Sequence, residues 1–284
     1  MTNISLWNNL DTQKRKYHNG GQKKNDRESE AYVMDIRFEK REHLKEKPDQ
    51  KHLGFGKYMT DYMFVMDWTK EEGWKDARIV PEGPITMDPA CVTLHYAQET
   101  FEGMKAYRTA EGKIQLFRPE MNAKRMINSN ARLCMPELPV DMFVEAVKAL
   151  VKVEEDWVPS EPETSLYIRP FMFATEAALG VHMANAYKFM IICCPVGAYY
   201  AAGLNPVKIL VEDELVRAVK GGTGFTKCGG NYAGSILGQV KAEKLGYAQV
   251  LWLDGEHRKY VEEVGTMNIM FKICLLYTSP SPRD

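Results

Sequence analysis

The sequence lacks several features that mark other classes of protein. Its longest apolar stretch, Phe189–Leu204, is interrupted by Pro195, Gly197 and Gly203, so we expect no membrane-spanning helix. The N-terminus has no charged start followed by an apolar core, so we expect no secretory signal. Six cysteines are too few for a disulfide scaffold in a chain of 284 residues, and we expect buried, reduced thiols. These absences favour a cytoplasmic protein.

Metal-binding patterns and charge of one sign are also lacking. No CxxC or HExxH occurs and the six histidines are scattered, so we expect no metal site. The 37 basic residues nearly balance the 38 acidic ones, which excludes a broadly basic surface for nucleic acid or anionic lipid. The one basic cluster, Lys14–Lys16 with Lys23 and Lys24, lies in a polar stretch and is better interpreted as a solvated tail than as a binding arm.

The residues that are present indicate a globular chain of two parts. Hydrophobic residues make up 45% of the sequence, enough for one large domain or two modest ones. Residues 1–33 are polar, and the sequence that starts at Met34 looks more like the natural start of a protein. We therefore expect residues 1–33 to be a disordered or non-native extension. Residues 196–206 predict an interdomain linker. Residues 274–284 have an unrelated composition that resembles one reading frame of a sequencing adapter, and we expect a foreign tail.

Apolar periodicity predicts alternating helices and strands. An amphipathic helix is predicted through Trp157, with Asp141 as its N-cap. A second helix is predicted from Tyr232 to Leu245, with Gly246 placed to end it. The predicted strands are Met59–Trp68, Leu166–Ile168, Lys188–Cys194, Val207–Val211 and Met267–Ile273, with a hairpin of Tyr247–Leu253 and Lys259–Val261 around Asp254-Gly255.

Lys227 is the first candidate for chemistry. It lies in Phe-Thr-Lys-Cys-Gly-Gly-Asn-Tyr, near the end of the glycine-rich loop Gly221–Gly230 and before the second predicted helix. A lysine that forms a Schiff base must be held near an electrophilic carbon and lose its proton readily. Flanking glycines let the backbone approach a planar cofactor closely. From the spacing alone, however, a surface lysine in a flexible loop is the simpler interpretation.

Other polar and aromatic residues each allow two interpretations. Glu263 could hold a pyridine nitrogen protonated, but an exposed glutamate at a strand end explains it as well, and Glu262 stands beside it. Arg125, at helical spacing, suits a phosphate, although a helix-surface arginine is commoner. The aromatic or basic residues that could either line a pocket or pack in the core are Tyr96, Phe101, Tyr167, Arg169 and Tyr199.

Five segments occur in an order that is typical of one family. They are Leu94–Tyr107 (LHYAQETFEGMKAY), Tyr167–Pro170 (YIRP), Cys194–Tyr199 (CPVGAY), Lys227–Tyr232 (KCGGNY) and Glu263–Asn268 (EVGTMN). Together they resemble the branched-chain amino-acid aminotransferases, within the fold-type IV pyridoxal-phosphate-dependent enzymes. The resemblance runs from about Leu44 to Phe271.

The resemblance implies pyridoxal 5'-phosphate as the cofactor and assigns its ligands by position. Lys227 would form the Schiff base and move a proton during catalysis. Glu263 would pair with the pyridine nitrogen, and Tyr232 would hydrogen-bond the phenolic oxygen of the ring. Arg125 would grip the phosphate, and Thr266 would lie near the cofactor on the substrate side.

The resemblance also implies an apolar substrate pocket. The residues that would wall it are Phe101, Tyr167 and Tyr199. Arg169 would tune its polar edge, and Tyr96 would face the same pocket. Leu179 and Val181 would reach in from the partner subunit of a homodimer. The implied reaction moves the amino group of L-leucine, L-isoleucine or L-valine to 2-oxoglutarate, giving branched-chain 2-oxo acids and L-glutamate.

The implied fold is a two-domain α/β architecture. A small N-terminal α/β domain is expected over residues 34–195, and the start of a larger, barrel-like α/β domain over residues 207–273. The downstream loop that would help to hold the phosphate is missing, so the large domain is expected to be truncated. Two alternatives stay open: another fold-type IV enzyme, such as a D-amino-acid aminotransferase or an aminodeoxychorismate lyase, or a non-catalytic fragment.

Overall fold

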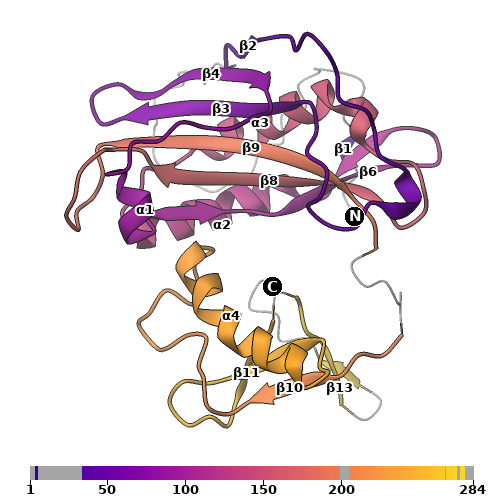
Figure 1. Ribbon diagram of the computed structural model, residues 1–284, viewed down its shortest axis with the longest axis vertical. Helices are drawn as coiled ribbons and strands as arrows, with labels where there is room; N and C mark the ends of the chain where they lie inside the picture. The colour runs from indigo at the N-terminus through magenta and orange to yellow at the C-terminus, as the bar shows by residue number, and fades with distance from the viewer. Residues whose placement is uncertain (1–3, 6–33, 199–204, 266, 274–275, 279–284) are drawn as a thin grey trace, which may run out of the picture. The chain divides into compact units, whose positions relative to one another are not determined.

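The chain divides into two compact units, Met1–Ala201 and Ala202–Asp284 (Figure 1). The computed structural model describes residues 4–5, 34–198, 205–265, 267–273 and 276–278. The predicted linker at 196–206 spans this division and lies partly outside the described residues, so the domain boundaries of the sequence analysis stay predictions. Within the described residues, no helix is both long and apolar enough to cross a bilayer.

The first unit is built on one large, mostly antiparallel sheet with the strand order β1-β7-β6-β8-β9-β3-β4-β2, and β5 also pairs with β8. Its strands are β1 (Ile4–Ser5), β2 (Arg37–Phe38), β3 (Tyr62–Thr69), β4 (Gly73–Pro81), β5 (Glu99–Phe101), β6 (Met104–Arg108), β7 (Ile114–Leu116), β8 (Ser165–Ala174) and β9 (Ala186–Val196). The long strand β9 pairs with both β8 and β3 and forms the centre of the sheet. The predicted strands in these three segments are confirmed.

Side-chain alternation gives this sheet two different faces. On β3, Phe64 and Met66 belong to the main core, whereas Met63 and Val65 belong to a separate, smaller cluster. The helices of this unit are α1 (Val92–Tyr96), α2 (Pro119–Arg132) and α3 (Val140–Val153), and α2 and α3 cover the main-core face (Figure 1). We call the other side, which carries Met63 and Val65, the second face.

Helix α3 differs from its prediction at both ends. It starts at Val140 with Pro139 in the N-cap position, so Asp141 lies inside the first turn and the prediction of Asp141 as N-cap was wrong. A carboxylate in the first turn still interacts favourably with the helix dipole. The α-helix ends at Val153, and a separate 3-10 turn covers Glu155–Trp157.

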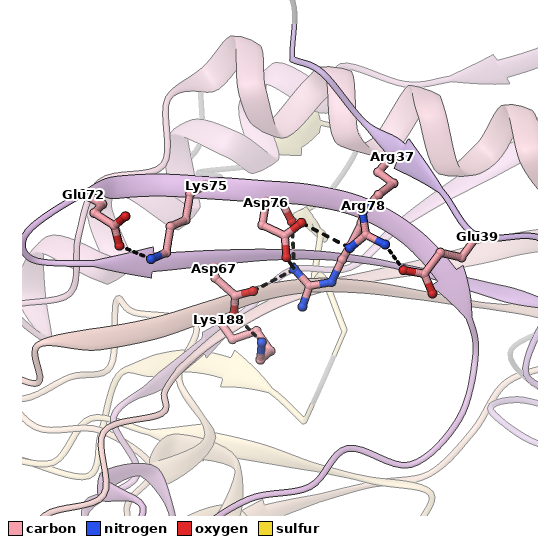
Figure 2. A network of polar contacts seen from close by, with 8 residues as sticks. All are labelled: Arg37, Glu39, Asp67, Glu72, Lys75, Asp76, Arg78 and Lys188. Carbon is pink, nitrogen blue, oxygen red and sulfur yellow. Dashed lines mark hydrogen bonds and ion pairs between the residues drawn. The ribbon is translucent and has the colours of Figure 1, made fainter.

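A network of charged side chains crosses strands β4, β3 and β9 on the second face (Figure 2). Its centre is Asp67, which accepts a hydrogen bond of 2.7 Å from Arg78 and also pairs with Lys188. Although burial raises it, the hydrogen bonds from Lys188 and Arg78 bring the pKa of the Asp67 carboxyl below its ordinary value. The network therefore joins three neighbouring strands through one ionised carboxylate.

The second unit is a small α/β assembly. Its sheet has the order β10-β11-β12, with β10 (Ile209–Glu212) parallel to β11 (Gln249–Leu253) and β12 (Val261–Val264) antiparallel to β11. Helix α4 (Gly229–Lys244) packs against the sheet, and Gly246 follows it at φ +77°, as expected of a glycine that ends a helix. The predicted helix and hairpin are thus confirmed.

The strand predicted near the end of the described chain is shorter than expected. The strand expected at Met267–Ile273 is reduced to β13 (Phe271–Ile273), which pairs with β14 (Leu276–Thr278). The backbone of β14 lies within the range predicted to be a foreign tail.

The cysteines in the described residues are all free thiols. Cys193 and Cys194 are both buried and alternate along β9, so they point to opposite faces, as the sequence indicates. The expectation of buried thiols is wrong for Cys134, which is exposed. Cys134 follows the end of α2 in a tight turn with φ 55°, outside the core.

Candidate active site

Lys227 stands on the loop before α4, in contact with the first turn of that helix. Its Nζ donates a hydrogen bond of 2.7 Å to the Tyr232 hydroxyl and lies 4.9 Å from the centre of the Tyr232 ring. The side chain is half-buried. An amine held against a phenol in this way is not the loosely placed surface lysine that the spacing alone favoured.

The loop that carries Lys227 is held in shape by Asn231. This side chain is 7% exposed, and its Nδ2 donates to the carbonyl oxygens of Thr223 at 2.8 Å and Thr226 at 2.9 Å. Its Oδ1 accepts from the Thr223 hydroxyl at 2.8 Å. Asn231 therefore satisfies the loop's polar groups and places Lys227 next to them. Sequence reasoning assigned Asn231 no role, although it stands inside the Lys227–Tyr232 motif.

Glu263 points inward from β12 to a buried arginine. Its Oε2 lies 2.6 Å from Nη1 of Arg217, whose side chain is only 7% exposed. The Cζ atom of Arg217 also lies 5.7 Å from the centre of the Tyr232 ring. Glu262, the alternative carboxylate, is exposed and projects to the other side of the strand. Lys227, Tyr232 and Glu263, which the sequence singled out, thus belong to one group of contacts in the second unit.

A hollow of about 210 Å³ lies beside this group. Arg217 and the glycine-rich loop, including Gly222 and Gly224, contribute to its lining. Thr266 and Tyr199 lie outside the described residues, so their predicted roles stay predictions.

Arg125 is held by a buried carboxylate in the first unit. It stands on α2, and its Nε and Nη2 each donate a hydrogen bond of 2.6 Å to Glu102, whose side chain is fully buried. Asn122, one turn earlier, also donates to Glu102 at 2.8 Å. A fork of this kind fixes the plane of the guanidinium, so Arg125 is not a solvated helix-surface arginine. Its predicted grip on a phosphate remains a prediction.

Phe101, Tyr167 and Arg169 form a second group of contacts in the first unit. The Cζ atom of Arg169 lies 4.5 Å from the centre of the Phe101 ring, and its Nη2 donates to the Tyr167 hydroxyl at 2.7 Å. A Cβ atom at Gly103 would collide with that hydroxyl, which explains why a residue without a side chain stands there. Phe55, which sequence reasoning did not select, packs edge-on against Tyr167 with ring centres 5.0 Å apart.

Tyr96 contacts the loop around Gly180, and its predicted place facing the substrate pocket remains a prediction. It ends helix α1, and its hydroxyl accepts a hydrogen bond of 2.8 Å from the backbone N–H of Gly180. Gly180 stands between Leu179 and Val181, which are 70% and 87% exposed. The structure therefore brings Tyr96 together with the loop that carries Leu179 and Val181.

The described candidate residues thus lie in one group of contacts in the second unit, around Lys227, and in three groups in the first unit, around Arg125, Arg169 and Tyr96. The described residues contain no cluster of three or more side chains that could hold a metal ion. No family model matches the sequence.

The fold is that of solved fold-type IV aminotransferases. The branched-chain amino acid aminotransferase of T.th. with pyridoxamine 5'-phosphate matches 70% of this chain and 62% of its own, with 29% identity and a TM-score of 0.57. An enzyme from the archaeon Thermoproteus uzoniensis shares the fold at 23% identity, with a TM-score of 0.62; the match covers 78% of this chain and 69% of that one.

Sequence comparison gives the family. The chain is 56% identical over 239 residues to branched-chain-amino-acid transaminase 1 of Bacillus subtilis (strain 168), covering 84% of this chain and 67% of that protein. It is 52% identical to the Mycolicibacterium smegmatis branched-chain-amino-acid aminotransferase, covering 77% of this chain and 60% of that protein. The chain therefore belongs to the branched-chain-amino-acid aminotransferase family, and it spans about two thirds of the length of the relatives it matches.

Proposed function

We propose that the protein transfers the amino group of L-leucine, L-isoleucine or L-valine to 2-oxoglutarate with pyridoxal 5'-phosphate as cofactor. The observation that carries this proposal is the 2.7 Å contact between Lys227 and Tyr232, since it places an amine and a phenol side by side on a shaped loop. Two solved structures of the T.th. enzyme contain pyridoxamine 5'-phosphate and N-(5'-phosphopyridoxyl)-L-glutamate, which supports the same cofactor here.

The chemistry of the candidate residues fits this cofactor. Lys227 supplies the amine, Tyr232 a hydroxyl for the phenolic oxygen, and Glu263 an anion for the pyridine nitrogen. Arg125 supplies a fixed guanidinium that suits a phosphate. We propose that Thr266 completes this set on the substrate side.

Each of these side chains has one task in the proposed reaction. When bound, the cofactor draws electrons from the substrate Cα, which makes the Cα proton acidic. Lys227 would take that proton as a base and deliver it to the C4′ atom of the cofactor, and Tyr232 would keep the amine in place by the hydrogen bond that the structure shows. Glu263 would pair with the pyridine nitrogen of the ring. Arg125 would hold the phosphate, so that the reacting atoms keep their orientation.

We propose that Phe101, Tyr167 and Tyr199 wall the substrate side-chain pocket. Burial of an aliphatic side chain against aromatic walls contributes roughly 0.8 kcal/mol per CH₂, which favours branched substrates over alanine. Arg169 lies over the ring of Phe101 and donates a hydrogen bond to the hydroxyl of Tyr167. It would present a cation at the edge of this pocket, where the second carboxylate of glutamate must fit.

We further propose a cytoplasmic homodimer. Leu179 and Val181 project from the loop fixed by Tyr96, and their exposure of 70% and 87% supports a role in reaching the partner subunit. Apolar side chains this exposed are more favourably placed against a second chain than in water.

The preferred amino donor tests the proposal. With 2-oxoglutarate as acceptor, glutamate formation is expected to be faster with L-leucine, L-isoleucine or L-valine than with L-alanine or D-alanine. Faster formation with D-alanine would instead indicate another fold-type IV aminotransferase, and the proposed function would be wrong.

A further inference from the structure

Arg217 contacts two residues that the proposed function assigns to the ring of the cofactor. Its Nη1 lies 2.6 Å from Glu263 Oε2, and its Cζ lies 5.7 Å from the centre of the ring of Tyr232. The Tyr232 hydroxyl in turn accepts the hydrogen bond of Lys227. Arg217 therefore contacts both the carboxylate of Glu263 and the phenol ring of Tyr232.

Arg217 is a permanent positive charge in a buried position. The side chain is 7% exposed, whereas that of Glu263 is 37% exposed. A guanidinium cannot lose its proton in a protein, and a buried charge is costly without a counter-charge. Glu263 supplies that counter-charge, and its outer part stays accessible for a second partner.

Two further carboxylates stand in this part of the second unit, Glu262 on β12 and Asp254 directly after β11. Burial raises the pKa of the neighbouring Glu262 carboxyl, Asp254 and Glu263 raise it further, and Arg217 opposes them. Without Arg217, the carboxylate of Glu263 would lose the counter-charge that lies beside it.

We infer that Arg217 is a positioning residue that keeps the proton shared by Glu263 and the cofactor's pyridine nitrogen on the nitrogen. This inference rests on the proposed function. Protonating the carboxylate forfeits its ion pair with Arg217, whereas protonating the ring leaves that ion pair intact. The same contact restricts the rotamers of Glu263 and aims its free oxygen. Arg217 thus acts through Glu263, and the cofactor remains the electron-withdrawing group.

The test measures the protonation of the ring nitrogen directly. Pyridoxal phosphate labelled with ¹⁵N in the ring is bound to the wild-type protein and to the variants R217Q, R217M and R217K, and its ¹⁵N resonance is recorded. R258M is the matched control, because Arg258 is an exposed arginine of the same unit. The dissociation constant of the cofactor is measured in parallel by absorbance titration.

Wild type, R258M and R217K are expected to show the resonance of a protonated ring, because each keeps a cation next to Glu263. R217Q and R217M are expected to shift toward the unprotonated resonance and to bind the cofactor about tenfold more weakly, as for a lost charge-assisted hydrogen bond. R217Q keeps the polarity and approximate size of the side chain, so it decides the matter if R217M does not fold.

Two outcomes separate the inference from the proposed function. If borohydride fixes the cofactor to Lys227 in all proteins and R217Q still shows a protonated ring, Arg217 does not control the position of the proton. In that case the inference is wrong and the proposed function stands. If the wild-type protein carries no label at Lys227, both the proposed function and the inference are wrong.

Discussion

At the scale of single residues, Lys227, Tyr232 and Glu263 belong to one group of contacts, which Arg217 joins from a loop. The resemblance named the first three of these residues. Arg217 and Glu102 were missed because a buried ion pair depends on which segments meet in space. An arginine in a loop and an acid between Phe101 and Gly103 give no such signal in the sequence.

The loop before α4 is predicted to depend on Asn231. Replacing it with alanine removes the hydrogen bonds of Asn231 to the Thr226 carbonyl oxygen and the Thr223 hydroxyl, and one of the three that the Thr223 carbonyl oxygen accepts. N231A is therefore expected to lower the free energy of unfolding by about 1–3 kcal/mol. N268A is the control, since Asn268 is exposed. Denaturant titrations in which the two variants lose equal stability would contradict this account of the loop.

At the scale of helices and strands, apolar periodicity predicted α3, α4, β3, β8 and β9, but it missed the long elements α2 and β4 as well as several short strands. The central strands β3, β8 and β9 carry enough apolar residues to be recognised, as does helix α3. Strands β5 and β7 have three residues each, too few for a period to be seen. The strand order could not be predicted, because β9 pairs with β3 across more than a hundred residues of chain.

The charged network on the second face is predicted to contribute stability through Asp67. The variant D67N leaves Arg78 and Lys188 facing each other, and a loss of about 1 kcal/mol is expected for partly exposed pairs. Because the folded pKa of Asp67 is lowered, this contribution is present above the unfolded pKa and is lost as the pH falls through the folded value. E72Q is the control, since the Glu72–Lys75 pair is more exposed and is expected to contribute little. Equal unfolding free energies for D67N and E72Q at pH 7 would argue against the network.

Glu154, at the end of α3, is predicted to make the first unit less stable as the pH rises. It is 1% exposed and accepts the Tyr62 N–H at 2.5 Å. Burial raises the pKa of its carboxyl to about 7, although the hydrogen bonds from Tyr62 and Thr60 oppose the shift. The contribution of a group with a raised folded pKa is complete below its unfolded pKa and is lost as the pH rises through about 7.

The variant E154Q isolates this effect. A shift of this size corresponds to about 3 kcal/mol, so the stability of E154Q relative to wild type is expected to increase by that order between mildly acidic and mildly alkaline pH. D156N, at an exposed neighbouring position, is expected to show no such trend. Unfolding free energies of E154Q and wild type that stay parallel across this range would show that Glu154 is ionised in the folded state.

At the scale of the whole molecule, the resemblance predicted the fold class and the family, and both are confirmed by the solved structures and relatives. Composition alone gave only a globular chain of one or two domains, because hydrophobic content does not distinguish one α/β fold from another. The contacts of Arg217 with Glu263 and Tyr232, and of Glu102 with Arg125, join segments that are separate in the sequence, so no local pattern predicts them.

The most direct test of the account is to map the lysine that carries pyridoxal phosphate. The protein is loaded with the cofactor, reduced with borohydride and digested, and the labelled peptide is identified by mass. K227R and K220R are treated alongside, because Lys220 is an exposed lysine of the same loop region. We predict a pyridoxyl group on Lys227 in wild type and K220R, and its loss in K227R. A label that persists in K227R, or one that is absent from Lys227 in wild type, would contradict the central claim.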